Sequence, residues 1–132
     1  MDATTLTILG WIARVLTVLV FVPMGINHFR RGPARAMAAM VPPRLRTTGL
    51  FRPQNLVAIT GLCEIAGGLG ILVPGVRIAA GLALAIFLVA VFPANAYAAA
   101  HREKFGRAAI PLVPRLLAQV ALIGIVLVAG LL

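Results

Sequence analysis

One apolar run with a carboxylate at its centre decides the fold of this chain: Asn55-Leu-Val-Ala-Ile-Thr-Gly-Leu-Cys-Glu64-Ile-Ala-Gly-Gly-Leu-Gly-Ile-Leu-Val-Pro74. The run is about 19 residues long, and as a helix that rises ~1.5 Å per residue it would just span the ~30 Å hydrocarbon core of a bilayer. Glu64 lies near its midpoint, where an ionised carboxylate costs at least a few kcal/mol. We therefore expect Glu64 to face protein or water and to have a partner.

The composition of the whole chain is that of a membrane protein. Of its 132 residues, 61% are hydrophobic and only 11% are charged, which is about half the charged fraction of a typical soluble domain. The net charge is +9, but the basic residues fall in the gaps between apolar runs, without interleaved aromatic residues or a nucleic-acid-binding motif. The charge therefore indicates membrane topology, and we expect a lipid bilayer rather than a nucleic acid as partner.

Four apolar runs predict an all-α, integral membrane four-helix bundle that occupies residues 1–132 as a single transmembrane domain. The helices are expected at about 5–29, 55–73, 78–100 and 112–132. An outer turn is expected at 74–77. The loops 30–54 and 101–111 carry most of the basic residues, so the positive-inside rule makes both loops cytoplasmic and places the N- and C-termini outside.

A short helix is expected within the first of these basic loops. Pro33 would begin it, and it would end at Met40, before Pro42 and Pro43. Its apolar residues lie among arginines, which favours a segment that rests on anionic headgroups. The alternative is a lid over a pocket that opens to the cytoplasm.

Counting residues from the outer face selects a partner for Glu64. Arg14 lies about eight residues down the first helix and Glu64 about nine residues down the second, so at ~1.5 Å per residue their levels differ by only a couple of ångströms. They are the only oppositely charged pair expected inside the bilayer, and each alone would be costly. We predict an intramembrane ion pair between Arg14 and Glu64, which either pins two helices together or also anchors a ligand.

A second polar level is expected near the cytoplasmic ends of the helices. Its side chains would form a polar pocket: Asn27, His28, Asn55, Asn95 and Gln119. His28 would lie ~20 Å from Arg14 along one interior seam, which suits an elongated amphiphile such as a quinone or a lipid. The sequence has no metal-ligand spacing, haem signature or phosphate-binding loop. We therefore expect no metal, haem or nucleotide, and no catalytic residue is assigned.

Glycines give the second predicted helix a face without side-chain bulk. Gly67 and Gly68 follow Glu64 at helical spacing, and such a face lets another helix approach closely. We predict Gly61, Gly67 and Gly68 as helix-packing residues. The one cysteine, Cys63, cannot form an internal disulfide, and we expect it to be an inert packing residue.

Three motifs carry a resemblance to a known family. They are Gly25-Ile-Asn-His28-Phe29 in the first helix, Thr60-Gly-Leu-Cys-Glu64-Ile-Ala-Gly-Gly-Leu-Gly-Ile-Leu-Val-Pro74 in the second and Phe92-Pro93-Ala94-Asn95 in the third. With four spans, they resemble the DoxX-like family of small bacterial membrane proteins over nearly the whole chain. The resemblance implies a multi-pass protein of the bacterial inner membrane. Members are linked to redox partners, such as a quinone-reducing thiosulfate oxidoreductase and complexes handling oxidative stress, and a remote animal relative is a receptor-assembly chaperone. The chain lacks the paired cysteines of a thiol-relay branch.

These features lead to three functional hypotheses. The first is a non-catalytic subunit or scaffold of a quinone- or oxidative-stress-linked redox complex in the membrane, whose polar seam holds a quinone or a lipid. The alternative is a membrane-protein assembly chaperone or helix-packing interaction protein, and its many glycines are compatible with a homo-oligomer. The third, a small enzyme or transporter, is disfavoured because four short spans with one buried carboxylate provide few groups for catalysis or transport.

Overall fold

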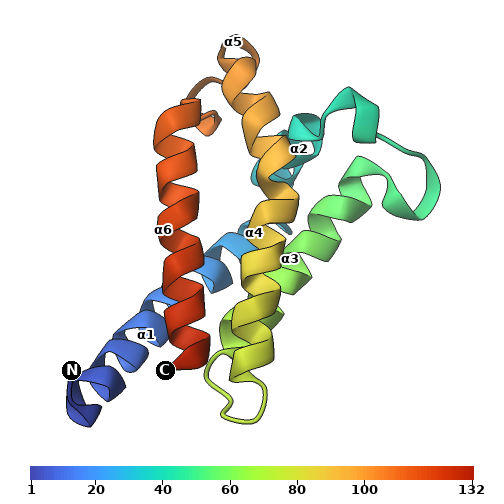
Figure 1. Cartoon of the computed structure of the whole chain (residues 1–132). Helices are drawn as coiled ribbons and strands as arrows, with labels where there is room; N and C mark the ends of the chain where they lie inside the picture. The colour runs from blue at the N-terminus through green and yellow to red at the C-terminus, as the bar shows by residue number, and fades with distance from the viewer.

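The computed structural model describes residues 1–132, which form α-helices and short 3-10 helices and no strand. The six α-helices are α1 (Ala3–Asn27), α2 (Arg31–Met40), α3 (Pro53–Gly70), α4 (Arg77–Ala100), α5 (Arg102–Phe105) and α6 (Leu112–Leu131) (Figure 1). The 3-10 helices are Pro43–Leu45, Gly49–Phe51 and Gly106–Ala108. The prediction of an all-α protein is confirmed.

The helix ends follow from local sequence. Asp2 precedes α1, and its carboxylate accepts a hydrogen bond from the Thr5 amide at 2.9 Å, which satisfies one of the free amides of the first turn. The same hydrogen bond holds the pKa of Asp2 below its usual value. Pro53 begins α3, at the position where a helix tolerates proline best. The short helix expected at Pro33 is α2, which begins two residues earlier, at Arg31.

Three helices, α1, α4 and α6, are long and apolar enough to cross a membrane. The fourth expected span, 55–73, is a helix, but α3 begins at Pro53 and ends at Gly70 and is not one of the candidates. The reason is its composition, because its first turn is polar and Glu64 lies in its second half. Length and composition therefore support three of the four predicted spans.

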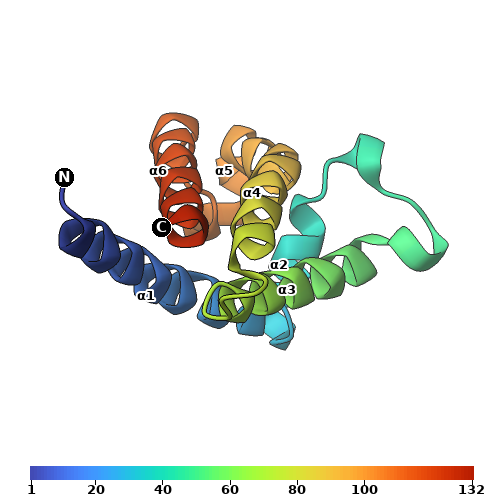
Figure 2. The ribbon, with the colours of Figure 1, turned by 60° about the horizontal axis from the view of Figure 1, so that its bottom comes forward.

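The four long helices pack in a ring. α1 lies against α3 and α6, and α4 lies against the same two helices. Figure 2 shows α1 and α3 along one side and α4 and α6 along the other. One buried apolar cluster joins α1, α4 and α6, and a second lies nearer the chain ends. The first contains Phe21, Leu84, Leu88 and Val126, and the second contains Ala13, Ile71 and Ala129.

The two ends of the molecule differ in character. Both chain termini lie at the same end as the turn between α3 and α4, whereas α5 lies at the opposite end (Figure 1). α2 follows α1 directly and packs against α3 and α4. Most of the arginines and lysines belong to the segments around α2 and α5. The structure thus places both termini on one side and the basic connections toward the other.

Candidate functional site

Two glycines set how α1 and α3 meet. A Cβ added to Gly25 would lie 2.8 Å from the carbonyl oxygen of Gly61, and one added to Gly61 would lie 2.5 Å from Cβ of His28. Neither position has room for a side chain, so the two backbones approach closely at this level. The contact brings His28, just after α1, against the middle of α3.

His28 is held by the backbone of α3. Its Nδ1 lies 2.8 Å from the carbonyl oxygen of Val57 and 3.1 Å from the Thr60 hydroxyl oxygen. A carbonyl oxygen only accepts hydrogen bonds, so Nδ1 carries a proton and donates it to Val57. The other ring nitrogen, Nε2, is left to face Glu64. Fixing one imidazole nitrogen in this way decides what the second can do.

Glu64 completes a buried pair with His28. Its Oε2 lies 3.3 Å from His28 Nε2, and the two side chains are 11% and 10% exposed. This is the one ion pair that the structure contains. The contact lacks the alignment of a good hydrogen bond, and Glu64 Oε2 is buried without a hydrogen-bond partner. One acceptor in the interior therefore remains unsatisfied.

α6 adds two polar residues to the interior. Arg115 and Gln119 are one helical turn apart and share a face. The half-buried Arg115 acts electrostatically on Glu64, although no salt bridge joins them. Gln119 is buried, and its Oε1 has no hydrogen-bond partner. The interior thus combines a His–Glu pair with an unpaired amide oxygen and a nearby cation.

The predicted ion pair between Arg14 and Glu64 is not formed, so this prediction is wrong. Arg14 is buried at the other end of the molecule, where its Nε donates to the carbonyl oxygen of Ala129 at 3.2 Å. Its guanidinium also lies 5.1 Å from the Trp11 ring centroid, in a cation–π contact. The partner of Glu64 is instead His28.

The physical reason is the register of α1 against α3. Glu64 lies against Gly25, eleven residues beyond Arg14, which at ~1.5 Å per residue is about 16 Å along α1. The prediction assumed that the outer ends of the two helices are level. They are not, because Ala13 lies in one buried cluster with Ile71, the residue that follows α3, so the first part of α1 extends past α3.

The predicted cytoplasmic-side pocket is only partly assembled. Asn27 accepts a hydrogen bond from Arg30 at 3.3 Å, and Asn55 accepts one from Arg52 at 3.4 Å, both at the surface. Asn95 is half-buried and makes no hydrogen bond through its side chain. Of the predicted residues, the structure brings His28 to Glu64 and buries Gln119 on α6, and it leaves the asparagines outside this site.

Sequence reasoning missed three contributions to the site. The carbonyl of Val57 and the hydroxyl of Thr60 orient His28, and Arg115 supplies a charge from α6. Thr60 precedes Glu64 by four residues, so its position on the same face could have indicated a role beside the carboxylate. Arg115 follows the basic loop 101–111 by only four residues, at the start of the last predicted helix. Nothing in its sequence neighbourhood indicates that it turns inward.

The three glycines predicted to pack helices lie at two different contacts. Gly61 and Gly68 face α1, where a Cβ on Gly68 would lie 3.1 Å from Val22. Gly67 faces α4, and a Cβ there would lie 2.5 Å from the Leu84 side chain. Cys63 points away from the other helices and is exposed, so it does not pack inside the protein.

The chain is all-helical, and three of its helices have the length and composition of membrane spans, which is compatible with a helical membrane protein. The chain belongs to the family described as Domain of unknown function (DUF8561), whose model matches residues 16–129. The matched region contains every residue of the site described above. No curated protein and no solved structure matches the chain.

Proposed function

We propose that this chain is a DoxX-like, non-catalytic subunit or scaffold of a redox-linked complex in the bacterial inner membrane, and that it holds a quinone or a lipid at the His28–Glu64 pair. In this proposal α3 crosses the bilayer with α1, α4 and α6 as a four-helix bundle whose termini lie outside. The observation that carries the proposal is the buried Glu64 Oε2 that has no hydrogen-bond partner.

An unsatisfied buried acceptor favours a ligand that can donate a hydrogen bond. Leaving such a group unpaired costs about 1–3 kcal/mol, and more when the group is charged. A hydroxyl on the head of an amphiphile, such as a quinol or a glycerolipid, would donate to Glu64 while its apolar tail followed the helices. Gln119 Oε1, which is also buried and unpaired, offers a second acceptor for the same chemistry.

The His28–Glu64 pair suits a binding role better than a catalytic one. With Nδ1 engaged by the Val57 carbonyl, His28 has only Nε2 free, and Nε2 lies 3.3 Å from the Glu64 carboxylate. Both groups are thus placed to contact the polar head of an amphiphile rather than to form a chain of acid–base groups. No third acid–base group lies in contact with it to form a longer proton path.

The test is native mass spectrometry of the full chain from mild detergent, comparing the wild type with Glu64→Gln. We expect the wild type to retain a quinone or lipid that the variant loses about tenfold or more readily, since a hydrogen bond to a charged group contributes about 1.5–3 kcal/mol. Glu103→Gln, at an exposed glutamate on α5, is the matched control and should behave as wild type. A wild-type protein that appears only as bare monomer contradicts the proposal.

A second candidate is a helix-packing interaction protein that assists the assembly of other membrane proteins. The observation in its favour is the outward face of α3, where Ile59, Leu62 and Cys63 are exposed beside the buried pair. Cross-linking through Cys63 in native membranes distinguishes the two. A discrete cross-linked partner without any bound amphiphile would favour the second candidate.

A further inference from the structure

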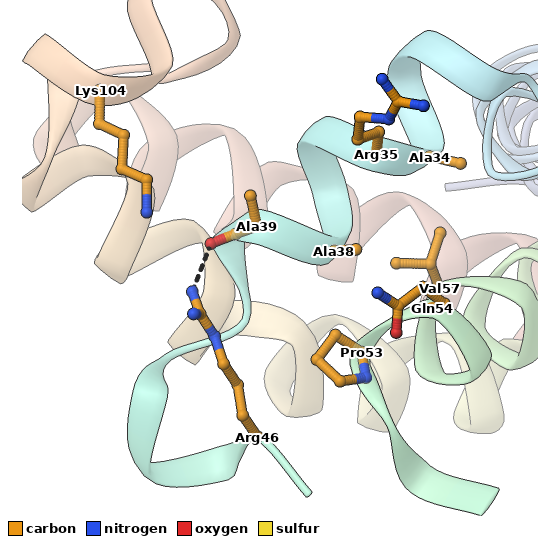
Figure 3. Close-up of a pocket in the computed structure, with 9 residues that line it drawn as sticks. All are labelled: Ala34, Arg35, Ala38, Ala39, Arg46, Pro53, Gln54, Val57 and Lys104. Atoms are coloured by element: carbon orange, nitrogen blue, oxygen red, sulfur yellow. Dashed lines mark hydrogen bonds between the residues drawn. The ribbon is translucent and has the colours of Figure 1, made fainter. Parts of the chain in front are cut away.

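A pocket of about 600 Å³ lies where α2 meets the start of α3. Neither His28 nor Glu64 lines it, although Val57, whose carbonyl holds His28, does. Figure 3 shows the side chains that line it, which come from α2, the segment after it, the first turns of α3 and α5. Its volume is in the range of pockets that bind small molecules, about 300–1,000 Å³. The pocket is therefore large enough for a ligand rather than a single ion.

The charge of this pocket is of one sign. Arg35, Arg46 and Lys104 line it, and none of the acidic residues of the chain does. The three cations come from segments that are far apart in sequence, and all three residues line the pocket. Like charges repel when they are brought together, and an anion between them removes that cost.

Arg46 is fixed in place at the rim. Its Nε donates to the carbonyl oxygen of Val41 at 2.8 Å. One terminal nitrogen donates to the carbonyl oxygen of Ala39 at 2.9 Å (Figure 3). Both carbonyls are at the C-terminal end of α2, where a cation is favoured. A guanidinium has five N–H donors, so further donors remain for a ligand. Lys104 of α5 also lines the pocket and adds an ammonium, which lies 5.4 Å from the Phe105 ring centroid.

The rest of the lining is apolar or neutral and suits an amphiphile. Ala34, Ala38 and Val57 provide an apolar wall beside the cations. Cations next to an apolar wall, at the end of helices apolar enough to cross a membrane, match a phosphate that is attached to acyl chains. A free phosphate would leave most of the volume and the apolar wall unused.

We propose that this pocket binds the phosphate of an anionic phospholipid headgroup, with Arg35, Arg46 and Lys104 as its ligands. Its polar ligands differ from those of the amphiphile site at Glu64, and the two sites share only Val57. A lipid bound there would contact α2, the start of α3 and α5 at the same time. Helix α2 would then select an anionic lipid, instead of resting on headgroups without distinguishing them.

The experiment titrates the purified full chain in mild detergent with phosphatidylglycerol and with phosphatidylcholine, followed by native mass spectrometry. Both lipids carry a phosphate, but phosphatidylcholine also brings a quaternary ammonium against the three cations of the lining. We therefore expect the wild type to bind phosphatidylglycerol about tenfold or more tightly. Arg35→Gln/Arg46→Gln/Lys104→Gln should lose this preference. The double variant Arg35→Gln/Lys104→Gln keeps the hydrogen bonds of Arg46 to α2 and should fold even if the triple variant does not. It should lose most of the preference for phosphatidylglycerol.

The matched control removes three positive charges from the same end of the molecule, at positions outside the pocket. Arg31, Arg44 and Arg107 are exposed and do not line the pocket, so Arg31→Gln/Arg44→Gln/Arg107→Gln should bind within about twofold of wild type. Equal losses in both triple variants would mean a diffuse surface attraction and overturn the site. Glycerol phosphate that binds as tightly as the lipid would overturn the lipid assignment. Glu64→Gln should leave phosphatidylglycerol binding unchanged. The lipid pocket and the proposed function can therefore be disproved independently of each other.

Discussion

His28 and Glu64 lie together inside the molecule, with 3.3 Å between Nε2 and Oε2. The carbonyl oxygen of Val57 holds Nδ1 of His28, so the other ring nitrogen is directed at the Glu64 carboxylate. A buried acid beside a basic group avoids part of the cost of an isolated buried ion. Each residue therefore depends on the other.

Removing one member of the pair should cost more than removing both. His28→Leu leaves Glu64 buried without its partner, so we expect a loss of about 1–3 kcal/mol in unfolding free energy. His28→Leu/Glu64→Leu removes the orphaned carboxyl and should recover part of that loss. Thermal unfolding of the purified protein in detergent measures both. Losses that simply add, within about 0.5 kcal/mol, would show that the two residues do not interact.

Arg14 and Glu64 should be energetically independent. Arg14→Leu removes the hydrogen bond to Ala129 in the last turn of α6 and should destabilise the protein by about 1–3 kcal/mol. Because Glu64 lies about 16 Å further along α1, the double variant Arg14→Leu/Glu64→Gln should show the sum of the two single effects within about 0.5 kcal/mol. A larger coupling energy in the same unfolding assay would mean that Arg14 and Glu64 do interact directly.

At the scale of the helices, glycine contacts determine the register. Gly61→Ala places a Cβ 2.5 Å from Cβ of His28, so α1 and α3 must separate and the His28–Glu64 contact must lengthen. We expect a clear fall in melting temperature, corresponding to a loss of roughly 1–3 kcal/mol. Gly124→Ala is the control, because a Cβ there meets nothing within 4 Å and alanine favours a helix by about 1 kcal/mol.

The two substitutions should therefore change the melting temperature in opposite directions. Both replace glycine by alanine in a long helix, so helix propensity alone predicts the same small gain at each position. Equal melting temperatures for the two variants would mean that α1 and α3 do not approach closely at Gly61.

The helices were predictable from the sequence, but their register was not. Apolar runs and prolines are local signals, and they correctly placed helices near 78–100 and 112–132 as well as the short helix α2. The level at which α1 meets α3 depends on a contact between Gly25 and Gly61, which are distant in sequence. Counting from the membrane boundary could not reveal this contact, so His28 was assigned to a separate level from Glu64.

At the scale of the whole molecule, the position of α3 decides how the protein sits in a membrane. α1, α4 and α6 are candidate spans by length and composition, whereas α3 is not. However, α3 packs against both α1 and α4 within the ring of long helices. In the four-span arrangement that we propose, α3 enters the bilayer because it packs against two helices that cross it. The contact of Glu64 with His28 then reduces the cost of a carboxylate inside the membrane.

The one cysteine tests this placement directly. Cys63 adjoins Glu64 and is exposed on α3, so a bilayer around α3 would cover its thiol with lipid. We expect Cys63 to resist a membrane-impermeant maleimide in sealed vesicles and to react after the membrane is dissolved in a denaturing detergent. In a Cys63→Ala background, Arg44→Cys on the exposed connection after α2 should react from one side of the membrane only. If Cys63 in sealed vesicles reacts as fast as this loop cysteine, α3 lies outside the bilayer and the four-span arrangement is wrong.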